Sequence, residues 1–155
     1  MIAALRLDRL FPIAAVLALL LSACEPLIAD YSLEAYKNAT TLKAETAALI
    51  DKSEEPYSAH KTDVDTLTTR INAAYEFAAG IPANTISAKQ WDLLRGDALF
   101  GGFVKTWAAQ STTGAAYRNE KKRQLAEAYD QIVCLEVNKQ SATSCTALAA
   151  KGDAP

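Results

Sequence analysis

The sequence has little of the chemistry that metal sites and nucleophilic enzymes need. Its 155 residues include one histidine, His60, and three cysteines. A structural zinc site takes about four Cys or His ligands, and a catalytic triad needs a base beside its nucleophile. We therefore expect no Cys/His metal site and no Ser-His-Asp triad, and we expect His60 to be a solvated or capping side chain near the start of a helix.

Motifs for other ligands are incomplete. The acidic pairs at 54–55 and 63–65 lack the glycine and the closing glutamate of a calcium loop. Residues 96–101 have the glycine spacing of a phosphate loop, but Gly102-Phe103 stands where Lys and Ser/Thr are needed. We expect no metal, no cofactor and no catalysis, and a small enzyme is the least favoured alternative.

Strand signals are equally scarce, and the chain has no excess of positive charge. No useful run of alternating Val, Ile or Tyr is present, and neither Asn-Gly nor Asp-Gly marks a hairpin. The formal net charge is -2, which argues against nucleic acid as a partner. These absences point to a helical protein that does not bind nucleic acid.

What the sequence does have is a hydrophobic N-terminal segment. Arg6 and Arg9 precede an apolar stretch at 10–21, and the small residues Ser22 and Ala23 follow. This order is typical of a signal peptide. The apolar stretch has about a dozen residues, whereas a membrane-spanning helix needs roughly 20. An uncleaved transmembrane helix and an ordinary secretory signal remain the alternatives.

The end of this segment, Leu21-Ser22-Ala23-Cys24, matches a lipobox. The chain therefore resembles a bacterial lipoprotein precursor over its first 24 or so residues. The resemblance implies that residues 1–23 are removed and that Cys24 carries fatty acyl chains such as palmitate on its sulfur and its freed amine. Glu25 follows in place of Asp, which by the same resemblance favours the periplasmic face of the outer membrane over the inner membrane.

The two remaining cysteines, Cys134 and Cys145, form an even pair in an oxidising compartment if Cys24 is lipidated. We predict a disulfide between them. It would close a loop of about a dozen residues, which the chain-entropy model values at roughly 3 kcal/mol. Two reduced thiols are the alternative, and the spacing is not that of a Cys-x-x-Cys redox motif.

The mature chain is organised as one helical domain. We expect a lipidated tether at 24–29, a helical bundle at 30–150 and a frayed tail at 151–155. The first helix is expected from a cap at Asp30 to about Lys52, and the second from about Tyr57 to Gly80. In the second helix the apolar residues recur at steps of 3, 4, 3 and 4: Val64, Leu67, Ile71, Ala74 and Ala78.

A third helix is expected to open on a capping box of Ser87 and Gln90 and to run to about Gln110. Gly101 and Gly102 predict a kink there, and two shorter helices are the alternative. Small residues at four-residue steps, Gly102 among them, mark a place where another backbone comes close. A fourth helix is expected at 115–139. The predicted fold class is thus all-α, an antiparallel bundle of about four helices.

Two groups of side chains are candidate contact sites. The third helix has more large aromatic side chains than packing along one helix face requires: Trp91, Phe100, Phe103 and Trp107. They either fill the core or line a face for a partner helix or an apolar ligand. A basic group at the head of the fourth helix either contacts an anionic surface or is a solvated helix end: Arg118, Lys121, Lys122 and Arg123.

From these observations we expect a non-catalytic envelope lipoprotein. Its helical domain would act as an interaction, assembly or pilot-type module for another envelope protein. The alternative is a carrier or binder of a lipid or other apolar ligand in a pocket lined by the third helix. The two hypotheses differ because a partner site predicts an open groove, whereas a carrier predicts an enclosed cavity.

Overall fold

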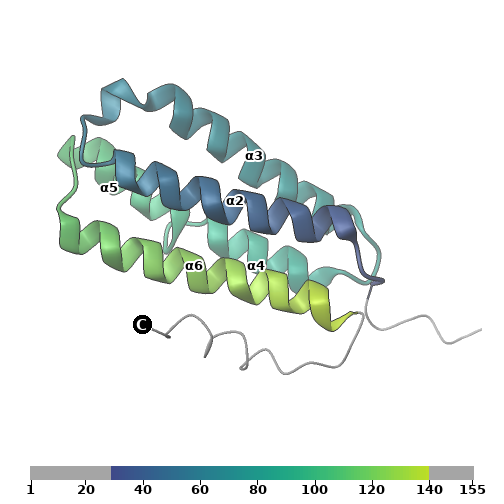
Figure 1. The fold of residues 1–155 in the computed structure, drawn as a ribbon. Coiled ribbons are helices and arrows are strands. Elements are labelled where there is room, and N and C mark those ends of the chain that lie inside the picture. The colour runs from purple at the N-terminus through teal and green to yellow at the C-terminus, as the bar shows by residue number, and fades with distance from the viewer. Residues whose placement is uncertain (1–28, 140–155) are drawn as a thin grey trace, which may run out of the picture.

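The computed structural model describes residues 29–139, and within this range the chain is an all-α bundle without strands (Figure 1). The elements in order are α2 (Leu33–Lys52), the 3₁₀ turn η2 (Tyr57–Ala59), α3 (Lys61–Gly80), α4 (Thr85–Arg95), α5 (Phe100–Gln110) and α6 (Ala115–Asn138). The predicted fold class is confirmed, and the third helix consists of the two shorter helices α4 and α5.

The helices run antiparallel, so their ends collect at two poles (Figure 1). At one pole α2 and α4 begin and α3 and α6 end; we call this the tether end, because the chain enters the bundle there from residue 29. At the opposite pole, the distal end, α2 and α5 end and α3 and α6 begin. With 24 residues in α6, the two ends are about 36 Å apart.

Two of the predicted helix caps were wrong. Helix α2 is capped by Ser32, whose hydroxyl accepts the Ala35 N–H at 3.2 Å, and not by Asp30. Helix α4 begins at Thr85, so Ser87 lies inside it and is buried. The capping box fails because Ser87 faces the core and because Asn84, at the cap position, uses its side chain in contacts with other segments.

The apolar seam of the second helix is confirmed. Its five residues, from Val64 to Ala78, are all at most 5% exposed in α3. The helix starts later than expected, because residues 57–59 form the tighter turn η2 before α3 begins at Lys61. Steps of three and four residues place these side chains on one face of the helix, and that face packs on α2 and α4.

The break in the third helix lies at residues 96–99, earlier than the predicted kink. Gly101 and Gly102 are instead the place where this loop folds back onto the start of α5. A Cβ atom at Gly102 would lie 1.9 Å from the Asp97 carbonyl oxygen, and one at Gly101 would lie 2.9 Å from that of Arg95. A backbone does come close to Gly102, but it is that of the loop immediately before α5 and not that of another helix.

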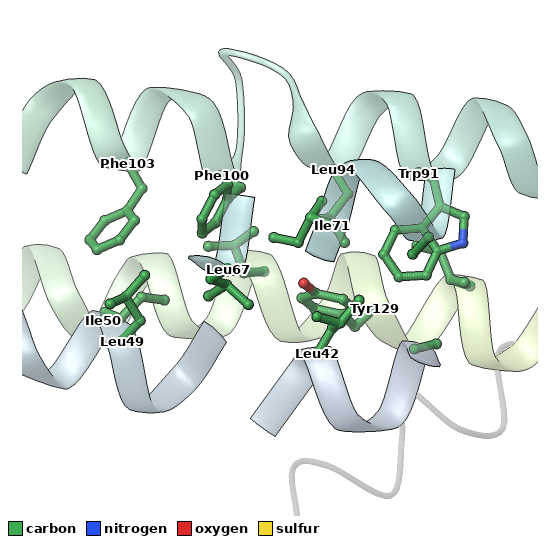
Figure 2. Packing of buried hydrophobic residues seen from close by; sticks show 14 of the residues in the cluster. Leu42, Leu49, Ile50, Leu67, Ile71, Trp91, Leu94, Phe100, Phe103 and Tyr129 are labelled. Atoms are coloured by element: carbon green, nitrogen blue, oxygen red, sulfur yellow. The ribbon is translucent and has the colours of Figure 1, made fainter. Parts of the chain in front are cut away.

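The core lies between all of these helices and is rich in aromatic side chains (Figure 2). Trp91 meets Tyr129 edge-to-face at 5.9 Å between ring centroids. The Tyr129 hydroxyl group shares a hydrogen bond of 2.9 Å with Thr46 Oγ1. The core therefore joins α4 to α6 and α6 to α2 through one buried tyrosine.

The distal end is fastened by backbone and hydroxyl contacts between its two connections. Thr113 donates its N–H to the Ser53 carbonyl at 2.7 Å, and their hydroxyl groups lie 2.5 Å apart. Tyr57 donates its N–H to the Ser111 carbonyl at 2.8 Å. The segment after α2 and the turn before α6 are thus held as one unit.

Candidate functional site

The chain is fastened to the tether end at two points before the first helix begins. Ala29, which is buried, donates its N–H to the Ala83 carbonyl at 3.2 Å. Ser32 donates its N–H to Glu136 Oε1 at 3.2 Å. The entering segment is therefore bound to the α3–α4 connection and to α6, not only to its own helix.

A buried ion pair forms the centre of this junction. Lys139 Nζ lies 2.6 Å from Glu136 Oε2, and the two side chains are only 4% and 3% exposed. Lys139 also donates to Asn84 Oδ1 at 2.7 Å, and Asn84 Nδ2 donates to the Ala78 carbonyl at 3.0 Å. Buried charges need such partners, because an unpaired one would pay a desolvation cost of several kcal/mol. We call Asn84, Glu136 and Lys139 with Ser32 the junction cluster.

The junction cluster connects four element ends. Ser32 caps α2, Asn84 precedes α4 and reaches the end of α3, and Glu136 and Lys139 belong to the end of α6. Sequence reasoning missed it. The signal was present, since Tyr129, Ile132, Glu136 and Lys139 follow one another at steps of 3, 4 and 3 and so fall on the inward stripe of α6.

The connection that receives Ala29 has an unusual backbone. Ala83 adopts φ of 59°, a left-handed value that a residue with a Cβ atom seldom takes. Beside it lies a groove of about 240 Å³ whose lining includes Ala83, Ile86, Leu135 and Lys139. The tether end therefore combines a buried polar cluster with an apolar surface next to the entering chain.

The four aromatic residues of the third helix lie in the core. Trp91, Phe100, Phe103 and Trp107 are each at most 2% exposed. Phe103 packs on both Phe100 and Trp107, with ring centroids 6.4 and 5.8 Å apart (Figure 2 labels Phe100 and Phe103). Of the two alternatives, these rings fill the core and do not line an exposed face for a partner or ligand.

The basic group of α6 lies at the distal end, and each cation there has a nearby partner. Arg118 pairs with Glu54 at 3.2 Å, and Lys122 pairs with Asp51. Arg123 bridges Glu120 and Glu127, and Lys121 bonds Gln124 at 3.0 Å. The contacts favour the second alternative, a solvated helix end, because acidic side chains neutralise most of the group.

His60 occupies the N-cap position of α3, as expected near the start of a helix, but its side chain makes no capping hydrogen bond and is not solvated. Its ring is mostly covered, with 14% of the side chain exposed, and packs 5.8 Å from the Trp107 ring. Nε2 lies 2.8 Å from Glu55, and Nδ1 lies 3.4 Å from Asp63. Hydrogen bonds from Lys52 and then from His60 hold the pKa of Asp63 below its usual range. The carboxylates on both sides and the tryptophan ring orient this imidazole.

Metal binding and membrane spanning find no support in residues 29–139. In this part of the chain no group of three His, Cys, Asp or Glu side chains is arranged to hold a metal ion. Nor does any helix here have both the length and the apolar composition needed to cross a bilayer.

The remaining predicted site residues are the cysteines. Cys134 is 1% exposed on α6, and its Sγ lies 3.6 Å from Asn138 Nδ2. Its predicted partner Cys145 and the lipidation site Cys24 lie outside the described residues, so the disulfide and the lipid anchor stay predictions.

Comparisons with known proteins add no relative. The chain matches no protein-family model, and searches of curated proteins and of solved structures found no match either.

Proposed function

We propose that the mature chain is a non-catalytic envelope lipoprotein, anchored by acyl chains on Cys24, whose helical domain binds another envelope protein. The observation that carries the proposal is the junction at the tether end. Only four residues, 25–28, separate the proposed lipidation site Cys24 from Ala29, where the chain is already fastened to the bundle. The five residue steps from Cys24 to Ala29 span at most about 18 Å, so a lipid on Cys24 would hold the whole domain close to the bilayer.

The placement of polar side chains supports a binding role over a catalytic one. The most deeply buried charged pair, Glu136 and Lys139, is used to join helix ends. The single histidine stands between two carboxylates and a tryptophan ring. These side chains are engaged in contacts that hold the fold together. Such a use of the buried polar groups favours a binding role.

The four buried aromatic rings weaken the carrier alternative. A carrier needs a cavity of roughly 300–1,000 Å³ that encloses its ligand. In place of such a cavity, the rings expected to line it contact one another and the rest of the core. A domain that presents its outer surface to a protein partner fits this packing better, and Glu25 after the lipidated cysteine favours the outer membrane as its location.

Mass spectrometry of the mature N-terminus tests the anchor. We expect acyl chains on Cys24 of the wild type and none on the Cys24→Ala variant. An unmodified mature N-terminus in the wild type would end the lipoprotein proposal.

Photocrosslinking and affinity purification of the anchored protein from its own cells test the interaction role. We expect one envelope protein to be captured from several positions on the outer helix faces. The control is the same probe at a core position such as Phe103. Recovery of bound lipid without any protein partner would favour the carrier alternative.

A further inference from the structure

Exposed apolar side chains gather at the tether end. Among the described residues, the large apolar side chains with more than a third of their surface exposed are Leu33, Phe77, Ile86 and Leu93. Leu33 is the first residue of α2, Phe77 lies in the last turn of α3, and Ile86 is the second residue of α4. Three of the four therefore lie at the pole where the tether joins the bundle.

The length of the tether decides what this surface faces. If Cys24 is acylated, Ala29 lies within about 18 Å of the headgroup region, whereas the distal end lies about 36 Å farther along the helices. The tether end is thus the part of the domain with the bilayer as its constant neighbour. The basic group of α6, which would otherwise compete for an anionic surface, lies at the other pole and is paired.

We infer that the tether end docks onto the membrane surface, with Leu33, Phe77 and Ile86 inserted among the lipid headgroups, and that the bundle stands with its distal end toward the periplasm. This inference rests on the proposed lipid anchor. Apolar side chains enter the boundary between headgroups and acyl chains, while neighbouring charges stay in water. Exposed Asp30, Glu34 and Lys89 lie beside the apolar residues and limit the docking to that boundary.

Docking would also bring the groove beside Ile86 to the membrane surface. Its lining residues Ala83 and Ile86 belong to the same pole, and Leu135 continues the apolar surface onto α6. An acyl chain or glycerol backbone at the interface would meet this groove as the domain docks. The chain's own residues 140–155, which follow α6, are the competing occupant, and the experiment below distinguishes the two.

Methyl NMR of the acylated, full-length mature protein in phosphatidylethanolamine–phosphatidylglycerol nanodiscs tests the docking. A small fraction of the lipids carries a gadolinium chelate on the headgroup. We expect relaxation to be enhanced most at Leu33 and Ile86, less at Leu93, and several-fold less at the distal Ala59 and Ala116, which are exposed. Equal enhancement at both poles, or a larger one at the distal pole, would overturn the inference.

A serine variant separates docking from mere tethering. Leu33→Ser, Phe77→Ser and Ile86→Ser together remove the apolar contact from exposed positions, while the acyl chains keep the protein on the disc. In this variant we expect the relaxation at Ala83 relative to Ala59 to fall several-fold. The matched distal variant is Ala59→Ser, Ala116→Ser, in which Ala115 replaces Ala59 as the reference. We expect the relaxation at Ala83 relative to Ala115 to stay unchanged in that variant. A gradient that the tether-end variant leaves unchanged would show tethering alone and would overturn docking.

Two further outcomes are informative. If the Ile86 methyl group is shielded from both the lipid-borne and a soluble gadolinium chelate, residues 140–155 cover the surface, and the membrane is not its occupant. A mature chain without acyl groups on Cys24 would end the proposed function as well. An acylated chain with uniform relaxation would end only the docking inference.

Discussion

Tyr129 shows how one side chain joins the core to the polar structure around it. It is fully buried, contacts Trp91 edge-to-face and shares a hydrogen bond with Thr46. Burial raises the pKa of Tyr129 above its usual value of 10.0, because the phenolate cannot be solvated there. The folded protein therefore keeps this proton at pH values where the unfolded chain releases it.

This shift makes the stability pH-dependent at the alkaline side. The stabilisation from keeping Tyr129 protonated is fully present below about pH 10, the pKa of tyrosine in the unfolded chain. Above pH 10 the free energy of unfolding falls by up to about 1.4 kcal/mol per pH unit. Tyr129→Phe should cost about 1 kcal/mol at pH 7 through the lost hydrogen bond but should remove this alkaline slope. Urea unfolding of both proteins from pH 7 to 11 should give curves that cross. Parallel curves would contradict the prediction, and Tyr36→Phe, at a half-buried position, is the matched control.

Gly102 is a residue whose side chain has no room. An added Cβ atom would meet the Asp97 carbonyl oxygen at 1.9 Å, so the loop at 96–99 must shift. We expect Gly102→Ala to lower the free energy of unfolding by about 1–3 kcal/mol. At Gly80, in contrast, an added Cβ atom meets nothing within 4 Å, and Gly80→Ala should be neutral or stabilising by up to about 1 kcal/mol. Chemical denaturation of both variants checks the pair, and equal effects would refute the steric argument.

At the scale of the elements, the structure depends on polar contacts that join helix ends. The junction cluster binds the start of α2, the end of α3, the start of α4 and the end of α6. Ser53 and Thr113 have a similar role at the distal end. The apolar stripes decide which helix faces meet, and these two groups of contacts hold the helix ends together.

The buried ion pair at the tether end should be costly to break. Lys139→Met leaves Glu136 charged and buried, so we expect a loss of about 3–5 kcal/mol in the free energy of unfolding. The double variant Glu136→Leu, Lys139→Met removes both charges and should recover much of that loss. Lys122→Met breaks the exposed pair with Asp51 and should cost about 0–1 kcal/mol. Similar losses at Lys139 and Lys122 in urea denaturation would contradict the assignment.

At the scale of the whole molecule, the positions of the helices could be predicted from the sequence, but the polar contacts that join their ends could not. Periodicity placed α3 and α6 well, because apolar steps of three and four residues record which face is buried. It failed at Asp30 and Ser87, because the true caps depend on tertiary contacts of Ser32 and Asn84. It also failed for Arg118 and Lys122, whose partners lie more than 60 residues away in sequence. Candidate sites chosen by residue type became core or paired surface, because type alone does not show what a side chain packs against.

The predicted disulfide tests whether the chain resides in an oxidising compartment, because disulfides persist there. We expect Cys134 and Cys145 to resist alkylation in the unfolded, unreduced protein and to react after reduction. We also expect reduction to lower the free energy of unfolding by about 3 kcal/mol. Labelling of both cysteines without reductant would refute the bridge, and cytoplasmic expression of the same chain gives the reduced reference.

The junction cluster has a mechanical consequence for an anchored domain. If Cys24 is acylated as proposed, a pull on the lipid would reach the hydrogen bonds of Ala29 and Ser32 before it reaches any helix. Under force these two hydrogen bonds would rupture first and release residues 29–32. The tether between Cys24 and the bundle would then lengthen by up to about 14 Å. The domain would thus carry a short extension that relieves strain at its attachment while helices α2 to α6 stay folded.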